Sequence, residues 1–598
     1  MSREIRLNAF DMNCVGHQSP GLWAHPRDRS WQYKDLEYWT DLAKILERGK
    51  FDGLFIADVL GIYDVYNGNG DAAIRQATQV PVNDPLSLIV PMALVTEHLG
   101  FGLTASLSFE HPYPFARRLS TLDHLTKGRI GWNIVTSYLE SGAKNLGQKA
   151  QTEHDARYDY AEEYLEVCYK LWEGSWEEGA VLRDRERRIF SDPSKIHEIR
   201  HVGKHFQVPG IHLCEPSPQR TPVLYQAGAS SRGKQFAAEQ AECVFVAAPS
   251  KVLLKKTVAD IRRRAAEAGR DPKKILIFNL QTVIVGETDA KAKAKFDEYK
   301  SYVSYEGAMA LISGWTGIDF SQFKPDEPLK HVHTNAIQSA VEAFSTADPN
   351  KVWTPNELAD WVGIGGFGPL FVGGPETVAD LLQEWVEDTD VDGFNLAYAL
   401  THETFIDAVD LLVPELQKRG VYKTEYAQGT LREKLFGDGA RLGANHPGAG
   451  YRDLSALHKT NVGGAVRRLD LPPIAVGQSQ MMSLIHRHRK PGESSHRPFY
   501  IQSARTIGGK VPRSETAATA QTPSSHSTIT LAFKLPSCCS QRSRRSRFSS
   551  ARANMPNTSI TLINRIRAKP LNNGVGHSCP VSTRTLIKPV TSRPATRP

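Results

Sequence analysis

The sequence predicts an α/β protein, a (β/α)8 TIM barrel with insertions that is followed by a disordered, basic C-terminal tail. Apolar segments of strand length alternate with amphipathic helical segments along the first three quarters of the chain. Alternation of this kind implies a parallel sheet. Eight strand–helix units spread over about 420 residues fit a closed barrel with insertions better than an open sheet.

The eight strands are expected where apolar runs are bounded by turn residues, at 5–12, 51–60, 101–109, 129–137, 221–228, 242–248, 275–286 and 391–400. The helices between them show apolar residues at three- and four-residue spacing, at 36–50, 84–100, 113–128, 159–174, 231–241, 250–269, 289–307, 375–390 and 404–420. Two stretches interrupt the alternation and are interpreted as insertions, residues 175–220 and roughly 305–371.

The charge of the chain divides into an acidic body and a basic tail. From Lys459 to Pro598 the sequence has 23 basic and 3 acidic residues, whereas residues 1–458 have 50 basic and 62 acidic ones. The tail is rich in Ser, Arg, Thr and Pro and has little apolar periodicity, so we expect residues 458–598 to be disordered. Such a tail can bind nucleic acid or an anionic membrane, but a functionless extension is favoured, and residues 1–457 are expected to form the whole catalytic domain.

Composition excludes several classes of protein. The chain has 40% apolar and 23% charged residues, which is ordinary for a globular protein. No run of 18 apolar residues and no signal-peptide core occur. The seven cysteines lack CxxC spacing, which argues against a zinc site or a disulfide framework. We therefore expect a cytoplasmic protein without a bound metal, a membrane partner or, for the body, a nucleic-acid partner.

Polar residues follow five of the expected strands. In a barrel the active site forms where the strands end, so these residues should converge on one mouth. They are Asn13, Cys14, His17, Asp58, Tyr63, Thr104, Ser106, Asn133, Thr136, Gly228, Ser230 and Ser231.

Two helix starts at this mouth are candidate phosphate sites. "EHDARYDYAEEY" places His154 and Tyr158 four residues apart in a first helical turn, and "GASSRGKQ" places Ser230 and Ser231 at a helix N-cap. Free backbone N–H groups at a helix N-terminus attract anions. For the first pair the alternative is a solvated surface turn, and for the serines it is plain N-capping.

A third motif is rejected. "GIGGFG", residues 363–368, matches G-x-G-x-x-G, but it follows the helical segment "PNELADWV" instead of a strand. A dinucleotide fingerprint must follow a strand and open a helix. We interpret this stretch as a mobile loop, so the chain has no nicotinamide-binding motif of its own.

Longer stretches carry a resemblance to a family. "NAFDMNCVGHQSPGLW", "FDGLFIADVLGIYDVY", "HPYPFARRLSTLDHLTKGRIGWNIVTS", "EHDARYDYAEEYLEVCYKLWEGSW" and "HLCEPSPQRTPVLYQAGASSRG" resemble the bacterial-luciferase-like flavin monooxygenases. Within that family they are most similar to the branch of nitrilotriacetate, EDTA, dibenzothiophene-sulfone and long-chain alkane monooxygenases. The resemblance covers about residues 4 to 455, and "CVGH" and "GIYDVY" are nearest to the alkane member.

The resemblance implies a two-component, FMN-dependent monooxygenase. Reduced FMN (FMNH2) would come from a separate NAD(P)H:flavin reductase and react with O2 to a flavin C4a-peroxide that inserts one oxygen atom into an organic substrate. Xenobiotic degradation and a homodimeric or homotetrameric assembly are also implied. By matching motif, Asp58 and Thr104 would line the flavin ring, Asn133 would lie near it, and the phosphate would be held by His154, Tyr158 and Ser230.

The same resemblance implies a substrate pocket with Cys14, His17, Tyr63, Gln79 and Asn133. His17 could hydrogen-bond the peroxide, or it could be a structural histidine, and Cys14 is more typical of a packing residue than of a nucleophile. Two departures put the substrate in doubt, because Tyr138 and the stretch "EGAMALISGW" stand where the alkane member has histidines.

Two other functions stay open on the same barrel. One is a deazaflavin-dependent oxidoreductase that does not use O2. The other is a flavin-binding protein without turnover.

Overall fold

The computed structural model describes residues 3–228, 230–329 and 353–457. The chain divides into two units, residues 1–475 and 476–598, and every described residue belongs to the first. The basic tail expected at 458–598 lies outside the described residues.

Eight parallel strands form a closed ring and confirm the predicted barrel. Their order around the ring is β1, β2, β3, β4, β9, β10, β11, β13 and back to β1. The strands are β1 (Arg6–Met12), β2 (Gly53–Ala57), β3 (Gly100–Ser106), β4 (Ile130–Val135), β9 (Val223–Gln226), β10 (Cys243–Val246), β11 (Leu276–Val285) and β13 (Gly393–Ala397). All eight were expected, although most are shorter than the apolar runs that predicted them.

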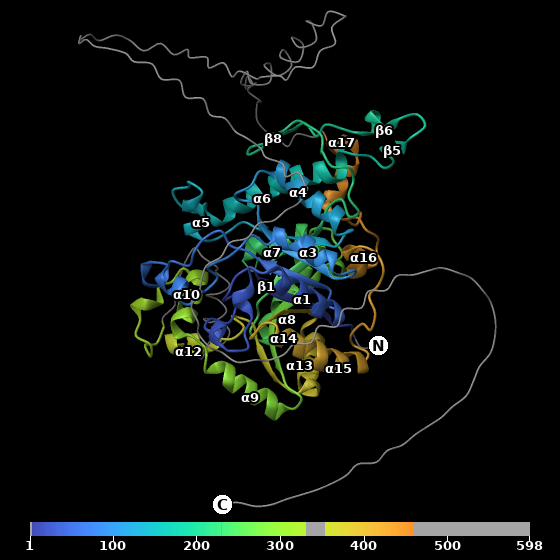
Figure 1. Ribbon diagram of the computed structural model, residues 1–598. Coiled ribbons are helices and arrows are strands. Elements are labelled where there is room, and N and C mark those ends of the chain that lie inside the picture. Colours follow the sequence, from blue (N-terminus) through green and yellow to red (C-terminus); the bar gives the residue numbers. More distant parts are fainter. Residues whose placement is uncertain (1–2, 229, 330–352, 458–598) are drawn as a thin grey trace, which may run out of the picture. The chain divides into compact units, whose positions relative to one another are not determined.

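Helices surround the ring, as Figure 1 shows. Those between successive strands are α1 (Leu36–Arg48), α3 (Leu86–Leu94), α4 (Pro112–Leu125), α6 (His154–Tyr169), α7 (Ser231–Gln240), α8 (Lys251–Glu267) and α13 (Pro375–Thr389). A π-helical turn, Lys170–Gly174, continues α6, and another, Ala408–Leu412, joins α14 (Glu403–Asp407) to α15 (Val413–Lys418). Shorter helices in loops are α2 (Asp71–Arg75), α5 (Glu140–Asn145) and α17 (Leu454–Leu457).

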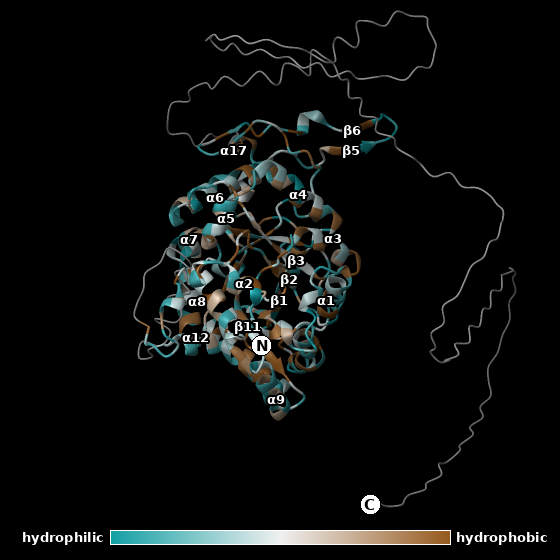
Figure 2. Ribbon diagram, turned by 60° about the vertical axis from the view of Figure 1, so that its left-hand side comes forward, coloured by the Kyte–Doolittle hydropathy of each residue, from teal (hydrophilic) through white to brown (hydrophobic). Residues whose placement is uncertain are grey.

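The core lies between the strands and the helices. All ten residues of β11 are buried, because one of its faces points into the barrel and helices cover the other. On α1 the buried residues recur at three- and four-residue spacing, at Tyr38, Trp39, Leu42, Ala43 and Leu46. Figure 2 shows the same pattern, with hydrophilic residues frequent on the outer helices.

The two predicted insertions carry short elements of their own. The first contains two small hairpins, β5 (Val181–Asp184) with β6 (Ile189–Ser191) and β7 (His201–Val202) with β8 (Gln207–Val208). The second contains α10 (Tyr305–Thr316) and α12 (Pro355–Val362).

Two predictions near the second insertion were wrong: the end of one helix, and the absence of a strand. The helix expected at 289–307 ends at Lys300 as α9 (Asp289–Lys300), because Ser304 caps the separate helix α10 by accepting a hydrogen bond from the Gly307 N–H. A strand was also missed, β12 (Leu370–Gly373), which pairs with the last residues of β11.

A C-terminal helix, α16 (Leu431–Phe436), seals the N-terminal end of the barrel. Leu431 and Leu435 pack in one cluster with side chains from inside the barrel, namely Phe55, Val223, Tyr225, Cys243, Phe245, Leu276 and Phe278. The Leu431 N–H donates to the Gly128 carbonyl over 2.7 Å. Ligands can therefore enter the barrel interior only from the opposite end.

A buried ion pair fixes α16 in this position. The Arg432 guanidinium donates to the Glu242 carboxylate over 2.7 and 2.8 Å and to the Thr221 and Pro222 carbonyls over 2.9 and 3.0 Å. Burial alone would raise the pKa of Glu242, but the charge and hydrogen bonds of Arg432 outweigh burial and lower it. The pair is therefore ionised and ties the chain between β9 and β10 to the C-terminal segment.

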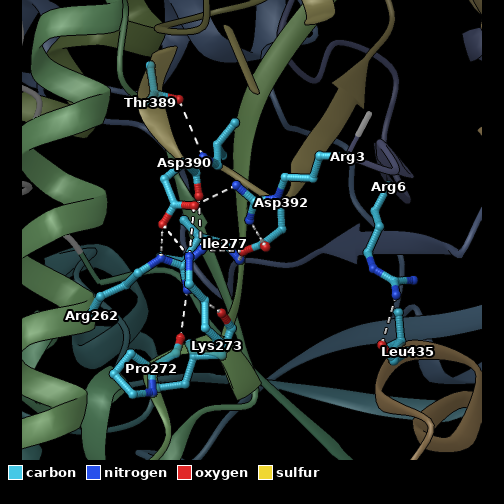
Figure 3. Close-up of polar contacts among 12 residues, drawn as sticks. Arg3, Arg6, Arg262, Pro272, Lys273, Ile277, Thr389, Asp390, Asp392 and Leu435 are labelled. Carbon is cyan, nitrogen blue, oxygen red and sulfur yellow. Dashed lines mark hydrogen bonds and ion pairs between the residues drawn. The ribbon is translucent and has the colours of Figure 1, made fainter. Parts of the chain in front are cut away.

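A second ionic cluster lies at the same end of the barrel, before β11 and β13 (Figure 3). Arg262 bridges Asp390 (2.5 Å) and Asp392 (3.0 Å), and Asp392 also accepts from the Ile277 N–H over 2.8 Å. Arg3 pairs with both aspartates. The cluster joins the N-terminal segment, α8 and the start of β13.

Removing the Arg432 side chain should destabilise the fold strongly. In Arg432→Ala the Glu242 carboxylate stays buried without its cation, which costs about 3–5 kcal/mol of unfolding free energy. Arg187→Ala is the matched control, because the Arg187–Asp184 pair has a similar 2.7 Å distance but lies on the surface, and its loss should cost less than about 1 kcal/mol. Denaturant unfolding measures both, with Arg432→Lys as a folded intermediate case. Equal, small losses would contradict the role assigned to Arg432.

Candidate active site

A cavity of about 370 Å3 opens at the C-terminal ends of the barrel strands. Its floor consists of aromatic side chains from inside the barrel, with Phe55 stacked on Phe10 at 5.2 Å and against Phe245 at 4.3 Å between ring centroids. Most of the predicted site residues line this one cavity: His17, Asp58, Tyr63, Gln79, Thr104, Asn133, His154, Tyr158 and Ser230. Cys14 and Ser231 do not.

One end of the cavity has the features of an anion site. His154 and Tyr158 lie in the first turn of α6, with ring centroids 5.3 Å apart, and Ser230 caps α7 by accepting from the Gly233 N–H over 3.0 Å. A Cβ atom at Gly228 or Gly233 would come within 3.0 or 2.8 Å of the Tyr158 hydroxyl oxygen. Glycine at both positions therefore keeps space open around the tyrosine hydroxyl.

Positive charge at this end comes from an arginine that sequence reasoning missed. Arg157 lines the cavity, and burial lowers the pKa of its guanidinium without removing the charge. A second cation, Arg232, lies over the Tyr158 ring at 5.8 Å. The sequence did contain a signal for Arg157, which stands inside the "HDARY" stretch. A doubly charged phosphate favours a cation beside the side chains that donate hydrogen bonds to it.

The middle of the cavity is lined by three predicted residues. Asn133 on β4 donates from its side-chain amide to the Thr104 hydroxyl oxygen over 3.0 Å. Burial, followed by the charge of Asp84, raises the pKa of Asp58 to about 7. Near neutral pH the Asp58 carboxyl is therefore protonated in a large fraction of the molecules.

His17 and Cys14 differ in their relation to the cavity. His17 lines it, packs edge-on against Phe10 at 4.5 Å, and has a pKa that burial lowers to about 3, so its imidazole is neutral. Cys14 forms an isolated β-bridge with Val82, and burial raises the pKa of its thiol well above the usual value. A buried thiol that does not line the cavity supports the packing interpretation of Cys14.

The end opposite the anion site is built around Tyr63. The Tyr63 hydroxyl donates to the Gln79 side-chain oxygen over 2.9 Å, contacts the Tyr138 hydroxyl at 2.6 Å, and accepts from the Trp315 indole N–H over 3.2 Å. Tyr138 and Trp315 also line the cavity, and both lie in stretches that depart from the alkane member's pattern.

The structure also places two remaining sequence candidates, Ser231 and the glycine run 363–368. The Ser231 hydroxyl accepts from Arg264 over 3.3 Å. The glycine run 363–368 lies between α12 and β12, so it is a loop, as expected, and does not open a helix. Within the described residues no group of three or more His, Cys, Asp or Glu side chains could hold a metal ion, and no helix is long and apolar enough to cross a membrane.

Comparison with known proteins identifies relatives over most of the described chain. The family described as luciferase-like monooxygenase matches residues 10–392. A dimethyl-sulfide monooxygenase of Hyphomicrobium sulfonivorans is 54% identical over 76% of this chain and 95% of that protein. A long-chain alkane monooxygenase of Geobacillus thermodenitrificans is 52% identical over 76% of this chain and all of that protein. The family resemblance drawn from the sequence motifs is confirmed.

Solved structures agree with these relatives. The crystal structure of DmoA from Hyphomicrobium sulfonivorans matches with a TM-score of 0.72 and 52% identity, over 79% of this chain and all of that one. A riboflavin lyase, solved with a modified FMN and riboflavin, matches with a TM-score of 0.71 and 36% identity, over 75% of this chain and all of that one.

The raised pKa of Asp58 predicts how stability depends on pH. An unfolded aspartate has a pKa near 3.9, so the native state holds more protons between about pH 4 and 7, and the free energy of unfolding falls as pH rises through that window. An asparagine side chain cannot titrate. Asp58→Asn should therefore lose the part of the decline in unfolding free energy that Asp58 causes, which is on the order of 2–4 kcal/mol. Denaturant unfolding of the flavin-free protein at pH 5 and pH 8 measures it.

Asp184→Asn is the control for this experiment. Hydrogen bonds from Arg187 lower the pKa of Asp184, so its titration lies below the window and the decline should persist in that variant. A decline of unchanged size in Asp58→Asn would show that Asp58 is ionised in the native state across the whole range.

Proposed function

This chain belongs to the luciferase-like monooxygenase family, and from that premise we propose that it oxygenates a small, neutral, apolar substrate with reduced FMN and O2. The observation that carries the proposal is one cavity with two unlike ends. A cationic end with hydrogen-bonding rings suits a phosphate, and an aromatic end without charged side chains suits an apolar molecule.

The cationic end fits the phosphate of FMN, the cofactor of the family. His154, Tyr158 and Ser230 are proposed to hydrogen-bond the phosphate, with Arg157 supplying positive charge. The space that Gly228 and Gly233 leave at the Tyr158 hydroxyl supports this assignment. Ser231 would take part only through its backbone N–H at the start of α7, because its hydroxyl is bonded to Arg264.

Asp58, Thr104 and Asn133 are proposed to line the flavin ring. Reduced FMN, when bound, supplies the activation of O2, and the chain's own residues bind, orient and exclude water. His17 is neutral, and a large fraction of the Asp58 carboxyls is protonated near pH 7. In these neutral forms both groups can hydrogen-bond neutral ring atoms without placing a full charge beside an apolar substrate.

The substrate class follows from the aromatic end. The relatives named above act, by their names, on dimethyl sulfide and on long-chain alkanes, and both substrates are neutral. Tyr63, Tyr138, Leu139, Trp315 and Phe367 all line the cavity and pack in one cluster of uncharged side chains. A thioether or an alkane is therefore the proposed substrate, rather than a carboxylate or a sulfonate.

Two kinds of protein partner belong to the proposal. A separate flavin reductase supplies the reduced flavin, since the glycine run 363–368 is not a nicotinamide site. A second copy of the chain is proposed to cover the exposed apolar side chains of α3 and α4, which are Val90, Leu94, Val95 and Leu125.

The phosphate assignment predicts a ligand-selective loss of affinity. In His154→Ala/Tyr158→Phe, reduced FMN should bind roughly a hundredfold more weakly or worse, because hydrogen bonds to a charged group contribute about 1.5–3 kcal/mol each. Reduced riboflavin, which lacks the phosphate, should lose little. Anaerobic titration of both flavins measures this.

A matched histidine–tyrosine pair, whose tyrosine lies on the same helix α6, controls for general damage. Tyr160 contacts His205 at 5.0 Å between ring centroids, and neither residue lines the cavity. His205→Ala/Tyr160→Phe should bind both flavins normally. Equal losses for both flavins in the His154/Tyr158 variant would mean that the pair does not contact the phosphate.

Turnover should require the reductase and should not require the tail. With FMN, NADH, O2 and a flavin reductase, the chain is expected to convert a dialkyl sulfide to its sulfoxide or an alkane to its alcohol, and a chain ending at Leu457 should do the same. Without the reductase, NADH should not be consumed. Flavin oxidation without an oxygenated product from either class would overturn the proposed substrate class, and loss of folding at Leu457 would move the domain boundary.

A further inference from the structure

The second insertion contributes two rings, Trp315 and Phe367, to the aromatic end of the cavity. His154 and Ser230 follow the neighbouring strands β4 and β9, whereas His17 follows β1 and Trp315 and Phe367 follow β11. In the ring order, β4 and β9 lie across the barrel from β13 and β1. A flavin held by its phosphate at the first side therefore leaves the second side for the substrate.

Behind this end the insertion is solid core. Trp315 and Phe367 line the cavity with ring centroids 4.7 Å apart, and each is at most 8% exposed. The residues around them in the same cluster are buried, including Leu311, Ile312 and Leu358. Within the described parts of the insertion, residues 305–329 and 353–371, a substrate that reaches these rings meets packed side chains.

The glycine run holds Phe367 in place. Gly366 has a positive φ of 66°, and a Cβ there would lie 2.1 Å from the Gln18 side-chain oxygen and 3.1 Å from the Trp315 ring. The Gly365 N–H donates to the Ser19 hydroxyl over 3.2 Å. The loop is thus fastened to the segment after β1, and its backbone lies too close to that segment and to Trp315 for a larger residue.

Tyr63 is fixed just as firmly, and its proton can be placed. The Gln79 amide N–H donates to the His17 carbonyl over 3.0 Å, so the Gln79 oxygen faces Tyr63 and accepts its only hydroxyl hydrogen. The Tyr63 oxygen then accepts from Trp315 and from Tyr138. The ring itself sits in a notch at Gly314, where a Cβ would lie 1.9 Å from it.

We propose that Tyr63, Trp315 and Phe367 form a rigid stop that limits the length of the substrate, with Gly314 and Gly366 setting its position. The inference rests on the proposed function and narrows its substrate class to short-chain thioethers or alkanes. Trp315 and Phe367 are specificity-determining residues in this account. Gly314 and Gly366 are positioning residues that act through Tyr63 and Phe367.

Binding without turnover tests the stop. The chain is mixed with oxidised FMN and no reductant, and calorimetry measures its affinity for methyl n-alkyl sulfides of increasing length. Affinity should rise about fourfold per methylene, since each buried methylene contributes about 0.8 kcal/mol, and should then fall once the chain reaches the stop. In Phe367→Ala the rise should continue to longer chains.

Two further variants complete the test. Phe323→Ala truncates a ring that packs in the same core but does not line the cavity, and it should keep the wild-type cut-off. Trp315→Phe keeps an aromatic ring but loses the hydrogen bond to the Tyr63 hydroxyl. In this variant affinity should fall less sharply with chain length, and the result tests the stop even if Phe367→Ala fails to fold. A cut-off at the same length in wild type, Phe367→Ala and Trp315→Phe overturns the stop, and so does the absence of any cut-off or of any binding in the wild type.

The stop and the proposed function fail in different ways. Sulfides that bind with the expected cut-off but give no oxygenated product with the reductase system contradict the function and support the stop. Oxygenation of long and short sulfides with equal efficiency supports the function and overturns the stop.

Discussion

Closure of the strand ring is the constraint on which the rest of the molecule depends. Pairing of β10 with β11 and of β13 with β1 leaves no free sheet edge in the ring, and it aims the C-terminal ends of all eight strands at one mouth. Side chains that follow different strands, and that are far apart in the chain, therefore meet at that mouth. His17, Asp58, Asn133 and Ser230 line one cavity for this reason.

The chemistry at this mouth depends on keeping buried side chains uncharged as much as on supplying positive charge. Burial makes the His17 imidazole neutral and raises the pKa of Asp58 to about 7, so a large fraction of this carboxyl is protonated near neutral pH. Among the lining residues, the arginine charge comes from Arg157, beside His154 and Tyr158. Such a division lets one cavity hold an ionic cofactor group and an apolar substrate without placing charge against the latter.

The sequence was enough to predict the barrel, because buried parallel strands read as continuous apolar runs. The sequence was not enough to predict β12. Its four residues follow a glycine-rich loop and end in the first glycine of "GGPE", and they form a strand by pairing with β11. At the site, motif spacing found the two helix starts but missed Arg157, which reads as one more charge on an amphipathic helix. It also overvalued Cys14, which is buried and does not line the cavity, and Ser231, whose hydroxyl is bonded to Arg264, because no local pattern records these placements.

The seal at the barrel's closed end also bears on how the chain is made. A ribosome delivers the eight strands before it delivers Leu431, Arg432 and Leu435, so the nascent barrel has an open end and an uncompensated Glu242 until synthesis passes residue 436. Domains tend to fold as their chains emerge, but here closure of the barrel's N-terminal end waits for α16. A nascent or prematurely terminated chain that stops short of this helix exposes apolar barrel interior and is a natural client for chaperones and proteases.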